Sequence, residues 1–195
     1  MGQSQTRRYE LGMENYHGEN YKTAVYYFQK NSEHAESLYM MGECYMAGHG
    51  IDCDRQRALD HYFKSYNLGY IPAAKRIAEI HNGSGNYKDA FEYYSVYYKK
   101  FDDPYVCLTL GEMAFYGIGT ETNYKMAFEL FTKLYSKRLA SNKVLYNLGT
   151  MHVEGLGTEK NKQEGIKILT IAHNNFYNDA TLYLQKLMGH YSENQ

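Results

Sequence analysis

The spacing of small residues constrains the fold of this chain more than any other feature of its sequence. Within Met41–Tyr66, Gly42 is followed at fixed intervals by Gly48, Gly50 and Ala58. The same intervals return twice further along the chain, first as Gly111, Gly117, Gly119 and Ala127 and then as Gly149, Gly155, Gly157 and Gly165. Self-similarity with a period of 20–50 residues is typical of a repeat array, in which each unit buries its apolar face against its neighbours.

Each repeat has the pattern of two helices joined by a turn. We predict a single repeat domain over residues 9–191, preceded by a disordered N-terminus at 1–8 and followed by a tail at 192–195. The expected units cover residues 9–34, 35–70, 71–101, 104–139 and 142–176. A final helix at 179–190 is expected to close the apolar seam with a face made of Leu182, Leu184, Leu187 and Met188. The first and third units have a shorter turn than the other three.

The first helix of the template unit has a clear buried face. Leu38, Met41, Gly42 and Tyr45 fall at positions i, i+3, i+4 and i+7, which share one side of a helix. A glycine inside a helix costs about 1 kcal/mol relative to alanine, so its recurrence needs a physical reason. We expect that the missing Cβ lets the second helix of the pair approach closely, with Ala58 as the matching small residue.

The turns between paired helices carry their own signals. Paired glycines such as Gly48 and Gly50 supply the positive φ that ends a helix and reverses the chain. A side-chain oxygen that can cap free backbone N–H groups then precedes each second helix of the long-turn units. These predicted N-caps are Asp54, Asn123 and Asn161.

Composition sets limits on the class of protein. With 44% apolar residues and 23 tyrosines among 195 residues, the chain is too apolar to be disordered. A net charge of −1 provides no overall field for nucleic acid. The three cysteines are an odd number without a CxxC pair, which favours reduced thiols and a cytoplasmic location. No run is long and apolar enough to span a membrane, and Gly2 with Thr6 fits a myristoylation pattern that could add a reversible anchor.

The long-turn units are similar to the Sel-1-like repeat, a relative of the tetratricopeptide repeat with a longer turn. The resemblance rests on three stretches in the same register, MGECYMAGHGIDCDRQRALDHYFK, LGEMAFYGIGTETNYKMAFELFTK and LGTMHVEGLGTEKNKQEGIKILTI. It implies an all-α, right-handed superhelix of about five helix pairs plus a capping helix, with the first helices lining a concave groove. It also implies an adaptor, scaffold or inhibitor such as an immunity protein. A cysteine-rich branch linked to β-lactam binding pairs cysteines within successive units, and this chain lacks those cysteines.

If the first helices line the groove, the residues opposite their buried face form its contact surface. The glutamate that follows the small residue recurs in three successive units, and with aromatic neighbours it would suit a basic or amphipathic peptide. The alternative interpretation is that glutamate is simply a good helix former on a solvated face. The predicted groove residues are Tyr39, Glu43, Met46, Lys75, Glu79, Leu108, Glu112, Phe115, Lys143, Tyr146, Thr150 and Val153.

The sequence favours a protein without catalytic activity, metal or cofactor. There is no GxxxxGK[ST] loop, GxSxG elbow or SxxK motif. The eight histidines form no HxxxH pair, and equivalent positions of a repeat array do not converge on one ion. The competing class is a small-molecule-binding or hydrolytic protein with its site in the groove, which would have a compact pocket with converging polar groups. Exposed tyrosines of the second helices offer a further surface for self-association.

Overall fold

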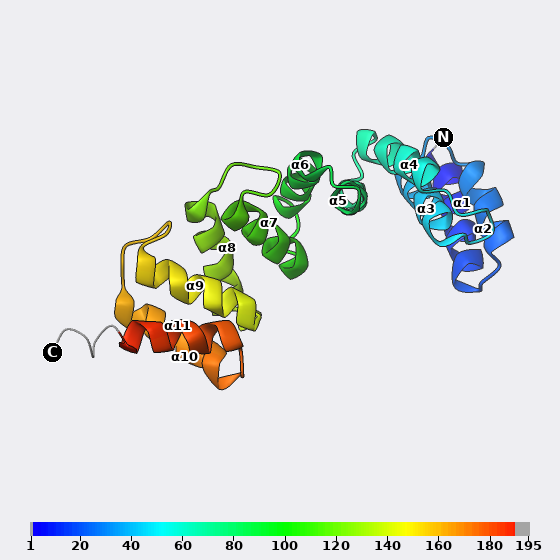
Figure 1. Cartoon of the computed structure of the whole chain (residues 1–195). Helices are drawn as coiled ribbons and strands as arrows, with labels where there is room; N and C mark the ends of the chain where they lie inside the picture. The colour runs from blue at the N-terminus through cyan, green and yellow to red at the C-terminus, as the bar shows by residue number, and fades with distance from the viewer. Residues whose placement is uncertain (1, 190–195) are drawn as a thin grey trace. The chain divides into compact units, whose positions relative to one another are not determined.

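The computed structural model describes residues 2–189. The chain divides into two compact units, Met1–Phe101 and Asp102–Gln195, each of which contains several of the predicted repeats and is called below the first unit and the second unit. Within residues 2–189 the regular structure consists of eleven α-helices (Figure 1). The first unit contains α1 (Gly2–His17), α2 (Tyr21–Gln29), α3 (Ala35–Ala47), α4 (Arg55–Asn67), α5 (Pro72–Gly83) and α6 (Tyr87–Tyr98). The second unit contains α7 (Pro104–Tyr116), α8 (Tyr124–Ser136), α9 (Asn142–Glu154), α10 (Lys162–Asn174) and α11 (Asn178–Gly189).

The helices pack as consecutive pairs, with α1 against α2, α3 against α4, α5 against α6, α7 against α8 and α9 against α10. Within the first unit, α2 also packs against α3 and α4 against α5, so each pair shares a seam with the next. The second unit repeats this arrangement, since α8 packs against α9 and α10 against α11. The prediction of an all-α repeat fold with five helix pairs and one further helix is therefore confirmed.

The N-terminal boundary differs from the prediction of a disordered segment at residues 1–8. Helix α1 begins at Gly2, and its first turns are attached to the loop after α2. The side-chain amide of Asn31 donates to the carbonyl of Gln5 at 2.8 Å, and Arg8 donates to the carbonyl of Lys30 at 3.2 Å. Asn31 is buried, so its bond to the α1 backbone satisfies a polar group that would otherwise be costly to bury.

The recurring helix glycines allow the close packing that was expected, and each lies against the large side chain four residues after the small residue of the second helix. All four residues of the predicted buried face around Gly42 are buried. A Cβ added at Gly42 would lie 2.4 Å from Cε1 of Tyr62, which sits one turn after Ala58 on α4. The same contact recurs in the pairs Gly12 and Phe28, Gly111 and Phe131, and Gly149 and Leu169. The glycine therefore provides room for the large side chain that fills the space between paired helices.

The predicted turns and caps of the long-turn repeats are present. Gly48 ends α3 in the left-handed conformation with φ of 71°, and Asp54 then accepts hydrogen bonds from the backbone N–H groups of Gln56 and Arg57, each at 3.0 Å. Asn123 and Asn161 cap α8 and α10 in the same way. A Cβ at Gly50 would lie 2.5 Å from the carbonyl of Tyr21, so this glycine lets the turn rest on the start of α2.

The final helix buries only part of the face that was predicted. The sequence pattern placed Leu182, Leu184, Leu187 and Met188 in the closing seam. In the structure Ala180 and Leu184 are buried, whereas Leu182 is 56% and Met188 62% exposed. Positions four apart on a helix share one face, so Ala180 and Leu184 form the buried face of α11, the helix that packs against α10.

Candidate functional site

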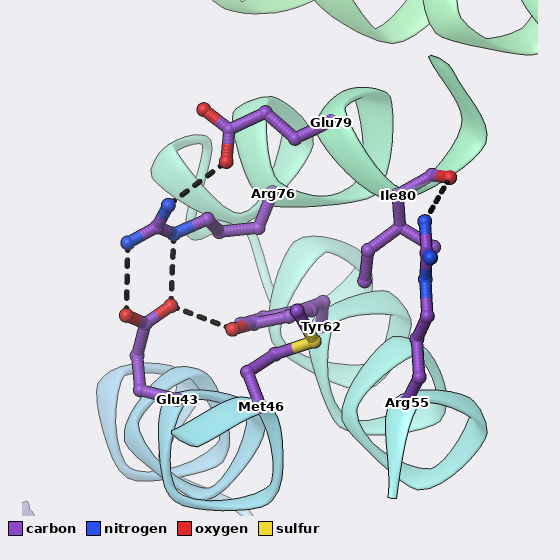
Figure 2. Close-up of a pocket in the computed structure, with 7 residues that line it drawn as sticks. All are labelled: Glu43, Met46, Arg55, Tyr62, Arg76, Glu79 and Ile80. Atoms are coloured by element: carbon purple, nitrogen blue, oxygen red, sulfur yellow. Dashed lines mark hydrogen bonds and ion pairs between the residues drawn. The ribbon is translucent and has the colours of Figure 1, made fainter. Parts of the chain in front are cut away.

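In the first unit, helices α3, α4 and α5 surround a hollow of about 270 Å³ (Figure 2). Its walls are formed by Glu43, Met46, Arg55, Tyr62, Arg76, Glu79 and Ile80. A second hollow of about 220 Å³ shares Arg76 and Glu79 with the first, and its other walls are Tyr39, Pro72, Lys75 and Tyr97. All five of the predicted groove residues in this unit therefore line one of two adjoining hollows.

Arg76 bridges the two predicted glutamates of the first unit. Its Nε and Nη2 atoms donate to the two carboxylate oxygens of Glu43 at 2.8 and 2.9 Å, and its Nη1 donates to Glu79 at 2.8 Å. The paired bonds to Glu43 are the bidentate geometry in which guanidinium and carboxylate bind most strongly. Because Glu43 lies on α3 and Arg76 on α5, this ion pair ties two neighbouring first helices together. The glutamates are thus half-buried and already paired, which differs from both interpretations of the sequence pattern.

Two tyrosines complete the network on the α3 side. The Tyr62 hydroxyl donates to Glu43 at 2.6 Å, and Arg76 Nε also donates to the Tyr39 hydroxyl at 3.3 Å. Burial, with a smaller contribution from the Glu43 charge, raises the pKa of Tyr39 to about 12. Burial and the bond to Glu43 likewise raise the pKa of Tyr62. Both phenols are therefore protonated at neutral pH, and the network has one fixed pattern of donors and acceptors.

The opposite side of the hollow is apolar with one cation above it. Figure 2 shows the Tyr62 ring and Met46 on the floor and Ile80 between the Arg76 network and Arg55. Met46 is 41% exposed, although its helix neighbours Tyr45 and Cys44 are buried. Arg55 donates one hydrogen bond, from Nη2 to the carbonyl of Ile80 at 2.8 Å.

The second unit repeats the pairing between neighbouring first helices. Lys143 of α9 forms an ion pair with Glu112 of α7 at 2.8 Å, and its ammonium lies 5.3 Å from the centre of the Tyr116 ring. The hydroxyl of Tyr183 on α11 donates to Glu154 of α9. A glutamate on one first helix is therefore held by a donor on the next in both units.

The remaining predicted residues of the second unit have mixed surroundings. Phe115 packs against Tyr124 and Phe131 of α8, so its ring belongs to the contact between paired helices. The Thr150 hydroxyl is buried, whereas Leu108 and Val153 are partly exposed. Tyr146 contacts the rings of Tyr177 and Tyr183, and it lines a hollow of about 240 Å³ with Asp179, Leu182, Tyr183 and Lys186.

Sequence reasoning missed four residues that shape the first-unit site, namely Arg55, Tyr62, Arg76 and Ile80. Arg76 could have been found from its position three residues before Glu79, because residues at i and i+3 are neighbours on a helix surface. The contacts of Arg55 carry no such signal, since this side chain reaches the carbonyl of Ile80 from a different helix.

Residues 2–189 contain no group of three or more His, Cys, Asp or Glu side chains that could hold a metal ion. No helix within that range is long and apolar enough to cross a membrane. The free thiols are Cys44 and Cys107, which are buried, and Cys53, which is exposed.

The structure consists of repeated helix pairs, and the candidate site lies on the first helices of these pairs. This is the architecture of a helical-repeat protein. The Sel1 repeat pattern matches residues 8–32, 35–70, 104–137 and 143–172, which is more than half of the chain. The chain therefore belongs to the Sel1 repeat family, whose members generally mediate protein–protein interaction. A comparison with curated proteins finds no match.

Solved structures agree on the fold. A Sel1 repeat protein from Oxalobacter formigenes is 20% identical with a TM-score of 0.69, over 91% of this chain and 74% of that one. The protective antigen c5321 of uropathogenic Escherichia coli, which has an SLR fold, is 20% identical with a TM-score of 0.73, over 94% of this chain and 41% of that one. MamA from Desulfovibrio magneticus RS-1 is 20% identical with a TM-score of 0.56, over 89% of this chain and 96% of that one.

Proposed function

We propose that this chain is a non-enzymatic interaction module that holds a segment of a partner protein against its first helices, as an adaptor, a scaffold or an inhibitor. The observation that carries the proposal is the pair of adjoining hollows between α3 and α5, lined by all five groove residues predicted in that unit. The exposed Met46 and the partly exposed Tyr39 and Tyr97 are residue types that commonly anchor protein interfaces. Further contacts are proposed along the second unit, through Leu108, Glu112, Lys143, Tyr146 and Val153.

The contacts of the site give catalysis little support. The pKa changes of Tyr39 and Tyr62 are explained by burial and by the Glu43 network, and every acceptor oxygen of that carboxylate already has a donor. A general base needs a carboxylate or imidazole within reach of a substrate proton. A volume of about 270 Å³ is small and stands at the lower edge of the range for small-molecule sites, about 300–1,000 Å³. One or two side chains of a peptide fit this hollow better than a drug-sized ligand.

The contacts of Arg76 change the chemistry expected of the partner. A basic peptide was expected because the glutamates were taken as open, and the bonds from Arg76 remove that argument. We therefore propose a partner protein, without the requirement that its bound segment be basic. The free thiols of Cys44, Cys53 and Cys107 support a reducing compartment, and we propose the cytoplasm.

Affinity capture from the native host with the full chain tests this function. Wild type is compared with Met46→Glu, which places a charge on the floor of the hollow, and with Tyr26→Glu, a matched change at a 55% exposed residue of second helix α2. The expected result is one identified protein that Tyr26→Glu retains and Met46→Glu loses, while circular dichroism shows both variants folded. Equal retention by both variants would reject the groove, and recovery of a small metabolite without protein would favour the competing class.

A further inference from the structure

The two adjoining hollows are not acidic, in contrast to what the glutamate pattern indicated. Three cationic side chains line them, Arg55, Lys75 and Arg76, against the two carboxylates of Glu43 and Glu79. Both carboxylates are bonded to Arg76, on α5. The acidic side chains of this face are therefore already paired with Arg76 and leave the charge of Arg55 uncompensated.

Arg55 is the cation with unused hydrogen-bonding capacity. Its side chain has five N–H donors in a planar fork, and one of them is taken by the carbonyl of Ile80. The neighbouring carboxylate of Asp54 is turned away, because it accepts from the backbone of Gln56 and Arg57 and lies 3.3 Å from Nε of Arg57. Arg55 forms no ion pair within residues 2–189. Its guanidinium is thus fixed at one edge and open along the rest.

The surface next to this guanidinium is apolar. The floor consists of Met46, which is 41% exposed, and the edge of the otherwise buried Tyr62 ring, and the nearly buried Ile80 forms the adjoining wall (Figure 2). The Arg76 network closes the opposite side with its donors and acceptors already paired. A bound segment would therefore contact an apolar floor, the hydrogen-bonded network of Arg76, and the N–H donors of Arg55 that have no partner within the hollow.

We propose that this hollow binds an acidic segment of the partner protein, with a carboxylate on Arg55 and a neighbouring apolar side chain over Tyr62 and Met46. The inference rests on the proposed function and adds the chemistry of the partner. A carboxylate is the group that matches the planar guanidinium fork, and the two carboxylates of this face are bonded to Arg76 and do not compete for Arg55. The small volume limits the contact to one or two side chains, as expected for a short linear segment.

Peptide binding by the full chain tests the inference directly. The probes are two matched peptides, acetyl-Ser-Glu-Leu-Glu-Ser-amide and its glutamine analogue acetyl-Ser-Gln-Leu-Gln-Ser-amide. Binding is followed by the chemical shifts of labelled protein, including the methyl groups of Met46 and Ile80. The acidic peptide is expected to bind about fivefold more tightly than the amide analogue, the ratio of one exposed ion pair, with its largest shifts at these methyls.

Two variants assign the preference to one side chain. Arg55→Gln should reduce the ratio of affinities to about one, whereas Arg57→Gln, which removes the same charge two residues along α4, should leave it unchanged. Arg55→Lys retains the positive charge without the planar guanidinium and should keep part of the preference for the acidic peptide. This variant therefore distinguishes the loss of the charge from a folding defect. Circular dichroism confirms that each variant is folded.

Several outcomes would overturn the inference. Equal binding of the two peptides, tighter binding of a lysine analogue, or an unchanged ratio in Arg55→Gln would each contradict it. Competition by oligothymidine as effective as the acidic peptide would show a general anion site instead of a peptide site. If the peptides show no preference while Met46→Glu still loses the captured partner, the acidic segment is wrong and the interaction function stands.

Discussion

Replacing Gly111 with valine tests the packing between paired helices. A Cβ at this position would lie 2.6 Å from Cε1 and 2.9 Å from Cδ1 of Phe131. Phe131 is fully buried, so its ring cannot swing into solvent to make room. Forcing extra carbon atoms into a packed core costs about 1–3 kcal/mol, and valine recovers only a few tenths of that through its better helix propensity. We therefore expect a loss of about 2 kcal/mol of unfolding free energy.

Urea unfolding followed by circular dichroism measures this loss. With a slope of roughly 2 kcal/mol per molar urea, the midpoint of the transition that involves the second unit should fall by about 1 M. Gly189→Val is the control, because no heavy atom of the described chain lies within 4 Å of a Cβ at that position. Its midpoint should stay close to that of the wild type.

A second substitution identifies the clash as the cause. Phe131→Leu removes the Cε1 edge that the new side chain meets. This substitution should therefore destabilise the Gly111→Val variant less than it destabilises the wild type. The difference between these two effects is the coupling free energy of a double-mutant cycle. An unchanged midpoint for Gly111→Val, or strictly additive effects in the cycle, would refute the close-packing argument.

Three further predictions follow from single groups. Glu43→Gln removes the charge partner of Arg76, so it should lower the unfolding free energy by about 1–2 kcal/mol in urea titration; no loss would mean that the ion pair contributes nothing. Burial and the Glu43 charge raise the pKa of Cys44 to about 12, so mass spectrometry after iodoacetamide treatment at pH 8 should find exposed Cys53 alkylated and Cys44 intact, and equal labelling would contradict the buried assignment. Burial, aided by Lys64, lowers the pKa of His61 below its ordinary value of 6.5, so the unfolded state takes up the proton first and stability should fall as pH drops below 6.5. Over the same drop in pH, the urea midpoint of His61→Asn should fall less than that of the wild type. An equal fall in both proteins would reject this cause.

The repeat architecture could be predicted because it depends on local backbone requirements. A left-handed residue ends each long-turn first helix, and glycine adopts that conformation at no steric cost, so Gly48 and its copies mark the turns. An oxygen-bearing residue must then cap the next helix, which made Asp54 recognisable. These requirements act over a few residues and leave a direct trace in the sequence.

The pairing within the groove could not be predicted in the same way. Repeat register correctly placed Glu43 and Glu79 on first helices, but it does not tell which cation of a neighbouring helix reaches them. Arg76 lies 33 residues from Glu43, and its orientation depends on how α5 packs beside α3. The acidic stripe became part of a balanced network because of this tertiary contact.

The N-terminal helix shows the same limit at the edge of the array. Its opening residues are polar and gave no periodic apolar signal, so a disordered segment was expected at 1–8. What attaches them is a buried asparagine, Asn31, whose bond to Gln5 spans 26 residues. Hydrogen bonds at this separation are invisible to patterns read within one helix.

Site-specific photo-cross-linking tests the central claim most directly, namely that a partner protein binds the first-helix face of the first unit. Benzoylphenylalanine is introduced at Met46 in the hollow and, in a second protein, at Tyr26 on second helix α2, and each is irradiated in cells of the native host. We predict one protein linked at position 46 and absent at position 26, attached through a segment that mass spectrometry shows to be acidic. Equal linkage at both positions, or linkage only at position 26, would contradict the account.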